Sequence, residues 1–476
     1  MVDVTVVGSG PNGLSAAVTA ARAGLSVRLV EGAQTLGGGM RTSELTLPGF
    51  RHDVCSAVHP AAMSSPFFRE FGLTERIEWI VPEVSYAHPL DQGEAAIAWH
   101  DLDRTVAGLG RDGPAWRRLL EPLIARAEGV VDFTGSQLLR IPSDPIAAAL
   151  YGLRALEQGS PLWKLRFREQ FAPALLTGVT AHASGGQPSL ATAGAGLLLA
   201  MHGHALGWGY PVGGSQSIAD VMVDDLLAHG GTVETGVRVD SLAQLEPSRA
   251  TLLDTSPKLL QTAELPGGYR RALERYRFGP GVAKVDFALS GPVPWSNAEV
   301  RLAPTVHLGG TRADIAAEEN AVLRGAVSPH PYVLVTQPSV LDDTRAPAGQ
   351  QVLWAYIHVP AGSTLDATEL VTAQVERFAP GFRDLILASA ASSATEMAAY
   401  NPNYIGGDIY SGALTLRQLV KRPVVSPAPW RTPIEGVYLC SSATPPGPAV
   451  HGMNGWYAAT LALRERFGIT TPPALR

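Results

Sequence analysis

The sequence predicts an α/β fold with more than one hydrophobic core, and three observations support this. The chain has 476 residues, of which 46% are hydrophobic, and this is enough to fill the cores of two domains. About 30 residues at the N-terminus follow the order strand, glycine turn, helix, strand. A mainly helical stretch then precedes several strand-like segments.

The N-terminal unit is the most clearly patterned part of the chain. Val4–Val7 is a β-branched strand, and Val27–Val30 is a second strand that ends at Glu31. Between them, a glycine turn leads into apolar residues at helical spacing from Leu14 to Ala21, and Gly24 ends the helix. This order predicts a βαβ unit of the dinucleotide-binding kind.

The glycine turn contains Gly8, Gly10 and Gly13, with Pro11 and Asn12 beginning the helix. The first glycine allows a tight turn, the second lets the backbone approach a pyrophosphate, and the third lets helix and strand pack closely. Free N–H groups at the helix start then face the phosphates. Glu31 lies at the distance expected of an acid that binds a ribose 2′-OH, which disfavours NADP. The alternative is an ordinary glycine-rich turn.

The remaining elements are predicted from their periodicity. Residues 101–200 predict mainly helices, including 116–126 and 145–156, and we interpret them as an inserted cap. A small-residue helix is expected over 454–467. The predicted strands are 232–233, 237–239, 251–253, 282–289, 332–336, 351–358 and 435–440.

A second glycine cluster, Leu36-Gly37-Gly38-Gly39-Met40-Arg41-Thr42, follows the βαβ unit. Its backbone can approach a pyrophosphate and a flavin ribityl chain, with Arg41 as a charge partner, whereas the alternative is a flexible surface loop. An acid after the second strand, then a double glycine and an arginine, resembles the FAD-binding pattern of the flavin amine oxidase and phytoene desaturase superfamily. FAD is therefore the expected cofactor.

The resemblance extends over nearly the whole chain. Its motifs are Tyr210–Ser215, Asn401–Tyr404 with the following Gly406-Gly407-Asp408, Tyr438–Cys440, and Val450–Met453. They are similar to those of the phytoene desaturase-related branch, which includes the pyridine nucleotide-disulfide oxidoreductase domain proteins. The match is specific for the family and not for a substrate.

This resemblance implies a Rossmann-like FAD-binding domain interleaved with a mixed α+β substrate domain. The FAD-binding domain would be assembled from residues 1–75, 205–265 and 425–476. The substrate domain would be assembled from residues 76–204 and 266–424, with the flavin between the two.

The resemblance also implies roles for individual residues. Val239, in the strand expected from Val237, would place its backbone against the adenine. Gly452, Met453 and Asn454 would form the turn into the last helix, with N–H groups facing the flavin pyrimidine. One departure is that residues 441–444 contain no acid, although the wider superfamily often has one there for the ribityl chain.

Lys284 is the principal catalytic candidate. Residues 281–287 with Pro294 and Trp295 resemble the strand whose lysine, in many amine oxidases, holds a water against flavin N5. A lysine can have its pKa tuned by burial, unlike arginine, and can position a water for reoxidation. The alternative is an edge-strand lysine that reaches solvent.

Two histidines, His59 and His451, are further candidates for the catalytic site, as are Tyr404 and Trp456 as lining residues. The alternative is that each is a structural histidine or a core aromatic. His182, His202 and His204 lie among small apolar residues, but their spacing with nearby acids is not that of a metal site. We expect no metal.

Bulk properties limit the partners. The net charge of −6 and the absence of basic runs argue against nucleic-acid binding. Two cysteines indicate a reducing compartment, and the high share of arginine and alanine suggests a bacterial protein. We expect a cytoplasmic location, with no signal peptide and no transmembrane segment, and peripheral membrane contact stays open.

Taken together, these features predict an FAD-dependent oxidoreductase. Hydride would pass from a hydrophobic or amine-containing small molecule to flavin N5, and oxygen or a quinone would accept the electrons. A second dinucleotide fingerprint is absent from the sequence, which disfavours a permanently bound NAD(P)H. The alternatives are a non-redox FAD protein such as an isomerase or hydratase, and a lipid-binding escort protein. The escort protein would not need the full FAD signature.

Overall fold

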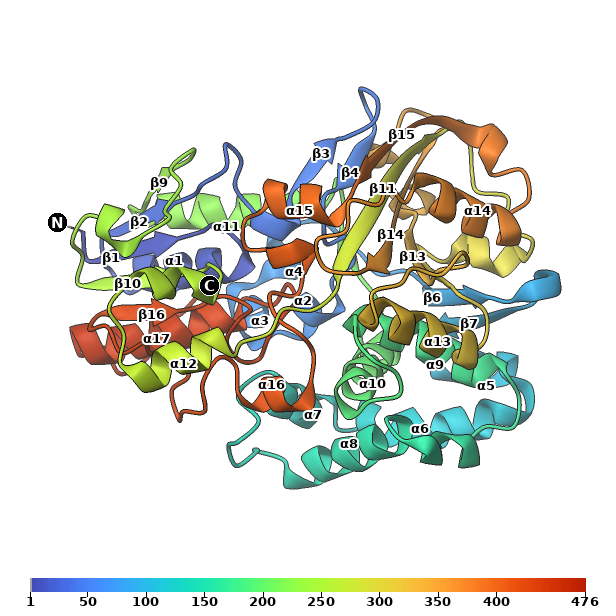
Figure 1. Cartoon of the computed structure of the whole chain (residues 1–476), viewed down its shortest axis with the longest axis horizontal. Coiled ribbons are helices and arrows are strands. Elements are labelled where there is room, and N and C mark those ends of the chain that lie inside the picture. The colour runs from blue at the N-terminus through green and yellow to red at the C-terminus, as the bar shows by residue number, and fades with distance from the viewer. Residues whose placement is uncertain (1) are drawn as a thin grey trace.

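A computed structural model describes residues 2–476 and contains two main β-sheets (Figure 1). The first sheet is parallel, with the order β16-β10-β1-β2-β9. Its strands come from three distant parts of the chain: β1 (Val4–Val7) and β2 (Val27–Val30), β9 (Thr232–Glu234) and β10 (Ala250–Leu253), and β16 (Val437–Leu439). This is the predicted α/β class.

Three helices cover the parallel sheet, and they explain its near-continuous apolar strands. The first helix, α1 (Pro11–Arg22), packs against both α11 (Gln216–Ala228) and α17 (Met453–Phe467). All four residues of β1 are buried. Gly13 and Gly455 allow close packing of α1 and α17, because a Cβ atom on Gly455 would collide with the carbonyl oxygen of Asn12.

The second sheet is mixed and has the order β15-β11-β14-β13-β12-β6-β7. Only the β12–β6 pairing is parallel. The strands are β6 (Val84–Pro89), β7 (Ala95–Trp99), β11 (Gly281–Leu289), β12 (Thr305–Leu308), β13 (Val333–Thr336), β14 (Gln351–Val359) and β15 (Ile386–Ser392). Four of them, β6, β7, β12 and β15, were not predicted from the sequence.

Helices near the lower edge of Figure 1 form the predicted cap. They are α5 (Leu102–Gly108), α6 (Gly113–Ile124), α7 (Ala127–Thr134), α8 (Pro145–Gln158), α9 (Phe171–Thr180) and α10 (Leu190–Ala205). The buried α10 packs against α6, α8 and α9. Among residues 2–476, no helix is long and apolar enough to cross a membrane.

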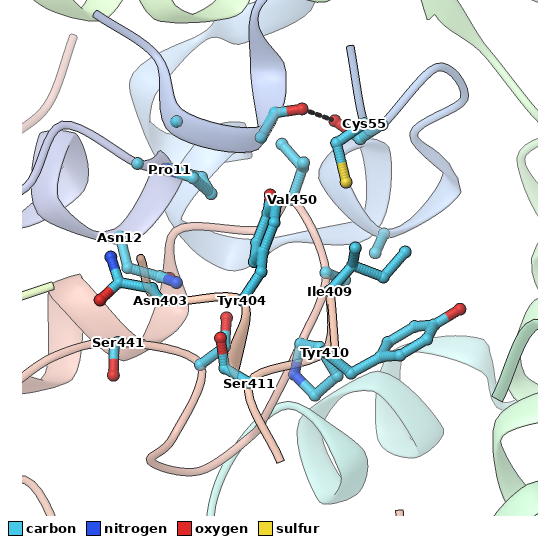
Figure 2. Close-up of a pocket in the computed structure, with 18 of the residues that line it drawn as sticks. Pro11, Asn12, Cys55, Asn403, Tyr404, Ile409, Tyr410, Ser411, Ser441 and Val450 are labelled. Atoms are coloured by element: carbon cyan, nitrogen blue, oxygen red, sulfur yellow. Dashed lines mark hydrogen bonds between the residues drawn. The ribbon is translucent and has the colours of Figure 1, made fainter. Parts of the chain in front are cut away.

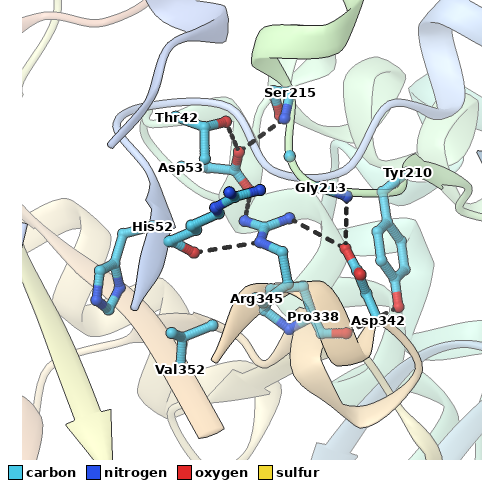
Figure 3. Close-up of polar contacts among 12 residues, drawn as sticks. Thr42, His52, Asp53, Tyr210, Gly213, Ser215, Pro338, Asp342, Arg345 and Val352 are labelled. Atoms are coloured by element: carbon cyan, nitrogen blue, oxygen red, sulfur yellow. Dashed lines mark hydrogen bonds and ion pairs between the residues drawn. The ribbon is translucent and has the colours of Figure 1, made fainter. Parts of the chain in front are cut away.

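A buried ionic network connects the two halves of the molecule (Figure 3). The Arg345 guanidinium lies 2.5 Å from the Asp53 carboxylate and 3.8 Å from that of Asp342. Asp53 also accepts hydrogen bonds from Thr42 and from the backbone N–H of Ser215. Burial alone would raise the pKa of Asp53, but Arg345 and these hydrogen bonds outweigh it and hold the pKa below its ordinary value.

Two expectations about strands are wrong. Residues 237–239 do not form a strand, because Gly236 takes a φ of 72° and the Val237 N–H bonds to the carbonyl oxygen of Glu31 instead of extending β9. Lys284 does not lie in an edge strand, because β11 is hydrogen-bonded to β14 on one side and to β15 on the other.

Candidate functional site

A cavity of about 1160 Å³ extends from the carboxyl ends of β1, β2 and β10 to the cap helices α8 and α10. Ligands of parallel α/β sheets bind beyond the carboxyl ends of the strands. The volume exceeds that of most single-ligand pockets, which range up to about 1,000 Å³, so it is large enough for a dinucleotide and a second molecule.

The first glycine turn forms a cradle at one end of this cavity. Gly8 has a φ of 96°, and a Cβ atom there would lie 2.6 Å from the carbonyl oxygen of Asp254. A Cβ atom on Gly13 would collide with the carbonyl oxygen of Gly8. Gly10 is the N-cap of α1, with Pro11 and Asn12 in its first turn and no side-chain cap. The free N–H groups at this end of α1 therefore suit an anion such as a pyrophosphate.

The second glycine cluster lies directly against the first. A Cβ atom on Gly38 would be 2.9 Å from the Cα atom of Gly10, and Gly37 and Gly38 both take left-handed φ values. The Gly37 N–H donates to Ser9 Oγ at 3.1 Å. Gly39 also needs its missing side chain, because a Cβ atom would be 2.8 Å from the Tyr404 hydroxyl. The two clusters, 24 residues or more apart in the sequence, thus form one surface.

Glu31 and Arg41 line the cavity beside these turns. The Glu31 carboxylate accepts hydrogen bonds from the Ser9 backbone and hydroxyl at 2.9 and 2.6 Å and from Ala33 N–H at 2.8 Å. Arg41 is buried, with its guanidinium 3.4 Å from Glu31 and 3.1 Å from the Tyr400 hydroxyl. Val239 also lines this end of the cavity, in an irregular segment anchored to Glu31 through Val237.

Asp254 is a site residue that sequence reasoning missed. It follows β10, lines the cavity and accepts a hydrogen bond from Gly13 N–H at 2.9 Å. Burial, together with the nearby Glu31 carboxylate, outweighs its hydrogen bonds from Gly13 and Gly10 and raises its pKa to about 7. Its position at the carboxyl end of a strand was the available signal, but the strand order that places it beside β1 was not known from the sequence.

The C-terminal turn forms where it was predicted, with α17 beginning at Met453 after Gly452, whose φ is 68°. Gly452, Met453 and Asn454 are buried behind the cavity wall, which is formed here by residues 446–450. Asn454 Nδ2 donates to the carbonyl oxygens of Ser441 and Thr444 at 3.1 and 2.7 Å. It therefore supports the segment that lacks the superfamily's acid.

The two candidate histidines occupy different positions. His59 lines the cavity, and its Nε2 atom lies 2.8 Å from Ser215 Oγ. His451 lies outside the wall, where its Nδ1 atom accepts a hydrogen bond from Met453 N–H at 3.1 Å. Burial lowers the pKa of each histidine to about 4. Both are neutral at pH 7 and both have structural partners.

Lys284 lies one layer behind the cavity wall. Its Nζ atom forms a buried ion pair with Asp286 on the same face of β11, and the ammonium is 5.6 Å from the centre of the Trp354 ring. Burial lowers the pKa of Lys284, although Asp286 opposes this shift. Burial also raises the pKa of Asp286 to about 6. Trp354 and Cys55, rather than Lys284, line the cavity at this point.

The far lobe of the cavity is aromatic and apolar. Tyr404 projects into its middle, between Asn12 on one side and Cys55 and Ile409 on the other (Figure 2). Leu198, on α10, forms part of its wall.

All charged residues that line the cavity, among those the structure describes, lie at the opposite end: Glu31, Arg41, Arg238, Asp240, Asp254 and Lys258. The far lobe contains two titratable histidines, His182 and His202. Burial lowers their pKa values to about 3 and about 4. The His182 Nε2 atom lies 2.6 Å from that of the buried His307. The lobe is therefore uncharged at neutral pH. Residues 2–476 contain no cluster of three or more His, Cys, Asp or Glu side chains arranged to hold a metal ion.

Comparisons with known proteins agree with this geometry. Residues 3–78 match the family model described as FAD dependent oxidoreductase. Pyridine nucleotide-disulfide oxidoreductase domain-containing protein 2 of Rattus norvegicus is 24% identical, over 97% of this chain and 93% of the relative. A limonene dehydrogenase polypeptide of Castellaniella defragrans is 31% identical, over 24% of this chain and 20% of the relative.

A similar solved structure is a double mutant of putrescine oxidase, with a TM-score of 0.62 and 16% identity over 98% of this chain and 99% of that chain. It shows the overall fold, in which the parallel sheet and the mixed sheet combine as in amine oxidases. The glycine cradle and the N-terminal match identify FAD as the cofactor, and the chain is an FAD-dependent oxidoreductase.

Proposed function

We propose that this enzyme, from the phytoene desaturase-related branch of the superfamily, oxidises a neutral hydrophobic small molecule. The observation that carries the proposal is the uncharged far lobe, lined by aromatic and aliphatic side chains. A substrate amine is protonated at neutral pH, and burying an ammonium without a carboxylate partner is costly. An uncharged alkyl or polyene substrate meets no such cost and gains from burial of its apolar surface.

We assign the charged end of the cavity to FAD. Gly8, Gly10 and Gly13, with Pro11 and Asn12, would hold the pyrophosphate, and Glu31 the ribose. Val239 would contact the adenine, and Gly37–Gly39 with Arg41 would face the central part of the cofactor. When bound, FAD supplies a hydride acceptor at N5. The three segments of the parallel sheet support the proposed FAD-binding domain (1–75, 205–265 and 425–476).

Lys284 is proposed as a positioning residue rather than a group in contact with substrate. Its ion pair with Asp286 and its stacking on Trp354 support a role in fixing the wall formed by Trp354 and Cys55. Gly452–Asn454 and His451 are proposed to act in the same way from the opposite side, by holding residues 441–450 against the cofactor. His59 would act through its contact with Ser215.

Anaerobic mixing tests the proposed substrate class. The FAD-loaded enzyme is mixed with neutral unsaturated terpenes and lipids and, in parallel, with primary amines of matched size, and the flavin absorbance band is followed. We expect bleaching with a neutral compound and none with the amines. Bleaching only by amines would overturn the substrate class, and turnover of a neutral compound without bleaching would support an isomerase or hydratase. Mixing the reduced enzyme with oxygen or with a quinone then identifies the electron acceptor.

A further inference from the structure

The cap carries an unusual exposed apolar surface at the end of the molecule that contains the far lobe. Every exposed residue of α8 is apolar: Pro145, Ile146, Ala149, Gly152, Leu153 and Leu156. An ordinary surface helix places polar residues on that face. The only charged residues of this helix, Arg154 and Glu157, lie on its flank and pair with each other at 3.3 Å.

Neighbouring segments extend this surface. The loop before α8 exposes Ile141 at 91%, and the short helix after it, η4 (Pro161–Leu165), exposes Leu165 at 85%. A second chain segment contributes Leu416 on α16 (Leu416–Val420) and Val425. A hydrogen bond of 3.0 Å from Gln137 to the Pro427 carbonyl joins the two segments, and α16 and α8 both lie near the lower edge of Figure 1. We name the exposed apolar residues of 139–165 together with Leu416 and Val425 the apolar rim.

The apolar rim surrounds a mouth of the cavity. Gly152 and Leu156 on α8, and Leu416 on α16, are exposed and also line the cavity. An apolar path therefore runs from the outer surface into the uncharged lobe. A water-soluble substrate does not need such an entrance, whereas a molecule dissolved among lipid acyl chains does.

Cations accompany the rim. Lys164 lies between Leu162 and Leu165, Arg417 follows Leu416, and Lys421 ends the same helical segment. In the part of the chain that the structure describes, these three side chains form no ion pair, whereas Arg126, Arg140 and Arg166 nearby are paired with carboxylates. Residues 409–434 contain no acid at all, although the whole chain has a net charge of −6. Local positive charge beside apolar side chains complements an anionic lipid surface.

We propose that the apolar rim docks this enzyme on the surface of an anionic lipid bilayer, so that a hydrophobic substrate enters the cavity directly from the membrane. The inference rests on the proposed neutral substrate. The exposed side chains enter the headgroup and upper acyl region, and Lys164, Arg417 and Lys421 meet the lipid phosphates. The mouth between α8 and α16 then opens into the bilayer.

Co-sedimentation of the FAD-loaded full-length chain with vesicles tests this. Pure phosphatidylcholine vesicles are compared with vesicles containing roughly one third phosphatidylglycerol. We expect binding to the anionic vesicles that weakens as salt is raised. The double variant Ile141→Asp with Leu165→Asp removes two of the most exposed apolar side chains, and we expect its binding to fall by about tenfold or more.

The matched control is Leu302→Asp with Leu323→Asp, which changes two leucines that are 49% and 53% exposed outside the rim. We expect this control to bind as the wild type does, and Lys164→Glu with Lys421→Glu to lose the preference for anionic vesicles. Absence of vesicle binding by the wild type, or equal losses in the rim and control variants, would overturn the proposal. A wild-type dimer in sedimentation velocity that the rim variant dissociates, without vesicle binding, would assign the rim to a second copy. The assay needs no turnover, so it is independent of the substrate test.

Discussion

FAD affinity should depend on pH through Asp254. The carboxyl group is buried, accepts a hydrogen bond from Gly13 N–H and has a pKa raised to about 7. A Cβ atom on Gly10 would be 2.5 Å from Asp254 Oδ2, so this carboxyl group lies against the cradle to which we assign the pyrophosphate. The groups nearest to it are the Glu31 carboxylate and the Cys440 thiol. Replacement of Asp254 by Asn keeps an oxygen acceptor for Gly13 and removes the titration.

The sign and size of the effect follow from linkage. The negative pyrophosphate raises the pKa of Asp254 further, so the FAD-bound form retains the proton above pH 7 while the free form loses it. Affinity is therefore fully present below the free-form pKa and is lost as the pH rises through it. Uptake of one proton with a free-form pKa of about 7 weakens binding by about tenfold between about pH 6 and about pH 8, or about 1.4 kcal/mol.

Titration of the apo-enzyme with FAD, followed by quenching of flavin fluorescence, measures the dissociation constant at each pH. We expect the wild type to lose about tenfold in affinity over this range and Asp254→Asn to stay within about twofold. Asp240→Asn is the matched control, because Asp240 also lines the cavity but its side chain is 63% exposed. The control should follow the wild-type curve. Parallel pH profiles for wild type and Asp254→Asn would refute the reasoning.

Three further predictions concern the ionic network, the buried lysine and the far lobe. Arg345→Met leaves Asp53 buried without its cation and should lower the free energy of unfolding by about 3–5 kcal/mol in chemical denaturation, whereas Arg383→Met, at an exposed pair with Glu369, should cost under about 1 kcal/mol; equal losses would contradict this. Lys284→Met should slow flavin reoxidation in stopped-flow mixing, and the double variant with Asp286→Asn should recover thermal stability without recovering the rate. An unchanged rate would remove Lys284 from the site. Ala195→Phe, which places a ring in the far lobe, should leave the FAD content unchanged and slow substrate bleaching by about tenfold or more; loss of FAD would show that the two ends of the cavity are not separate.

Local features of the fold could be predicted from the sequence. The βαβ unit, the helix starting after Gly452 and strands such as 282–289 depend on turn chemistry and periodicity within a few residues. The mixed sheet depends on pairing between residues far apart. Val306 pairs with Ala87, and no local pattern in the 84–99 region indicates that partner. Residues 237–239 were assigned to a strand because β-branched side chains favour one, but Gly236 ends the ladder first.

The candidate site divides in the same way. The two glycine clusters could be predicted because glycine at those spacings has a backbone reason. Asp254 could not be placed, since its proximity to Gly13 requires β10 to pair with β1. The position of Lys284 behind Trp354 also depends on packing across β11 and β14. The uncharged state of His182 and His202 is a consequence of burial, which periodicity does not report.

The amount of FAD bound to the purified chain tests the central claim most directly. The flavin released on denaturation is identified and quantified against protein, for the wild type and for Gly10→Val, whose side chain would collide with Asp254. Ala195→Phe, which changes only the far lobe, is the control. We predict one FAD for each wild-type and Ala195→Phe chain, and none for Gly10→Val. A wild-type chain that neither carries FAD nor gains thermal stability from added FAD would contradict the account.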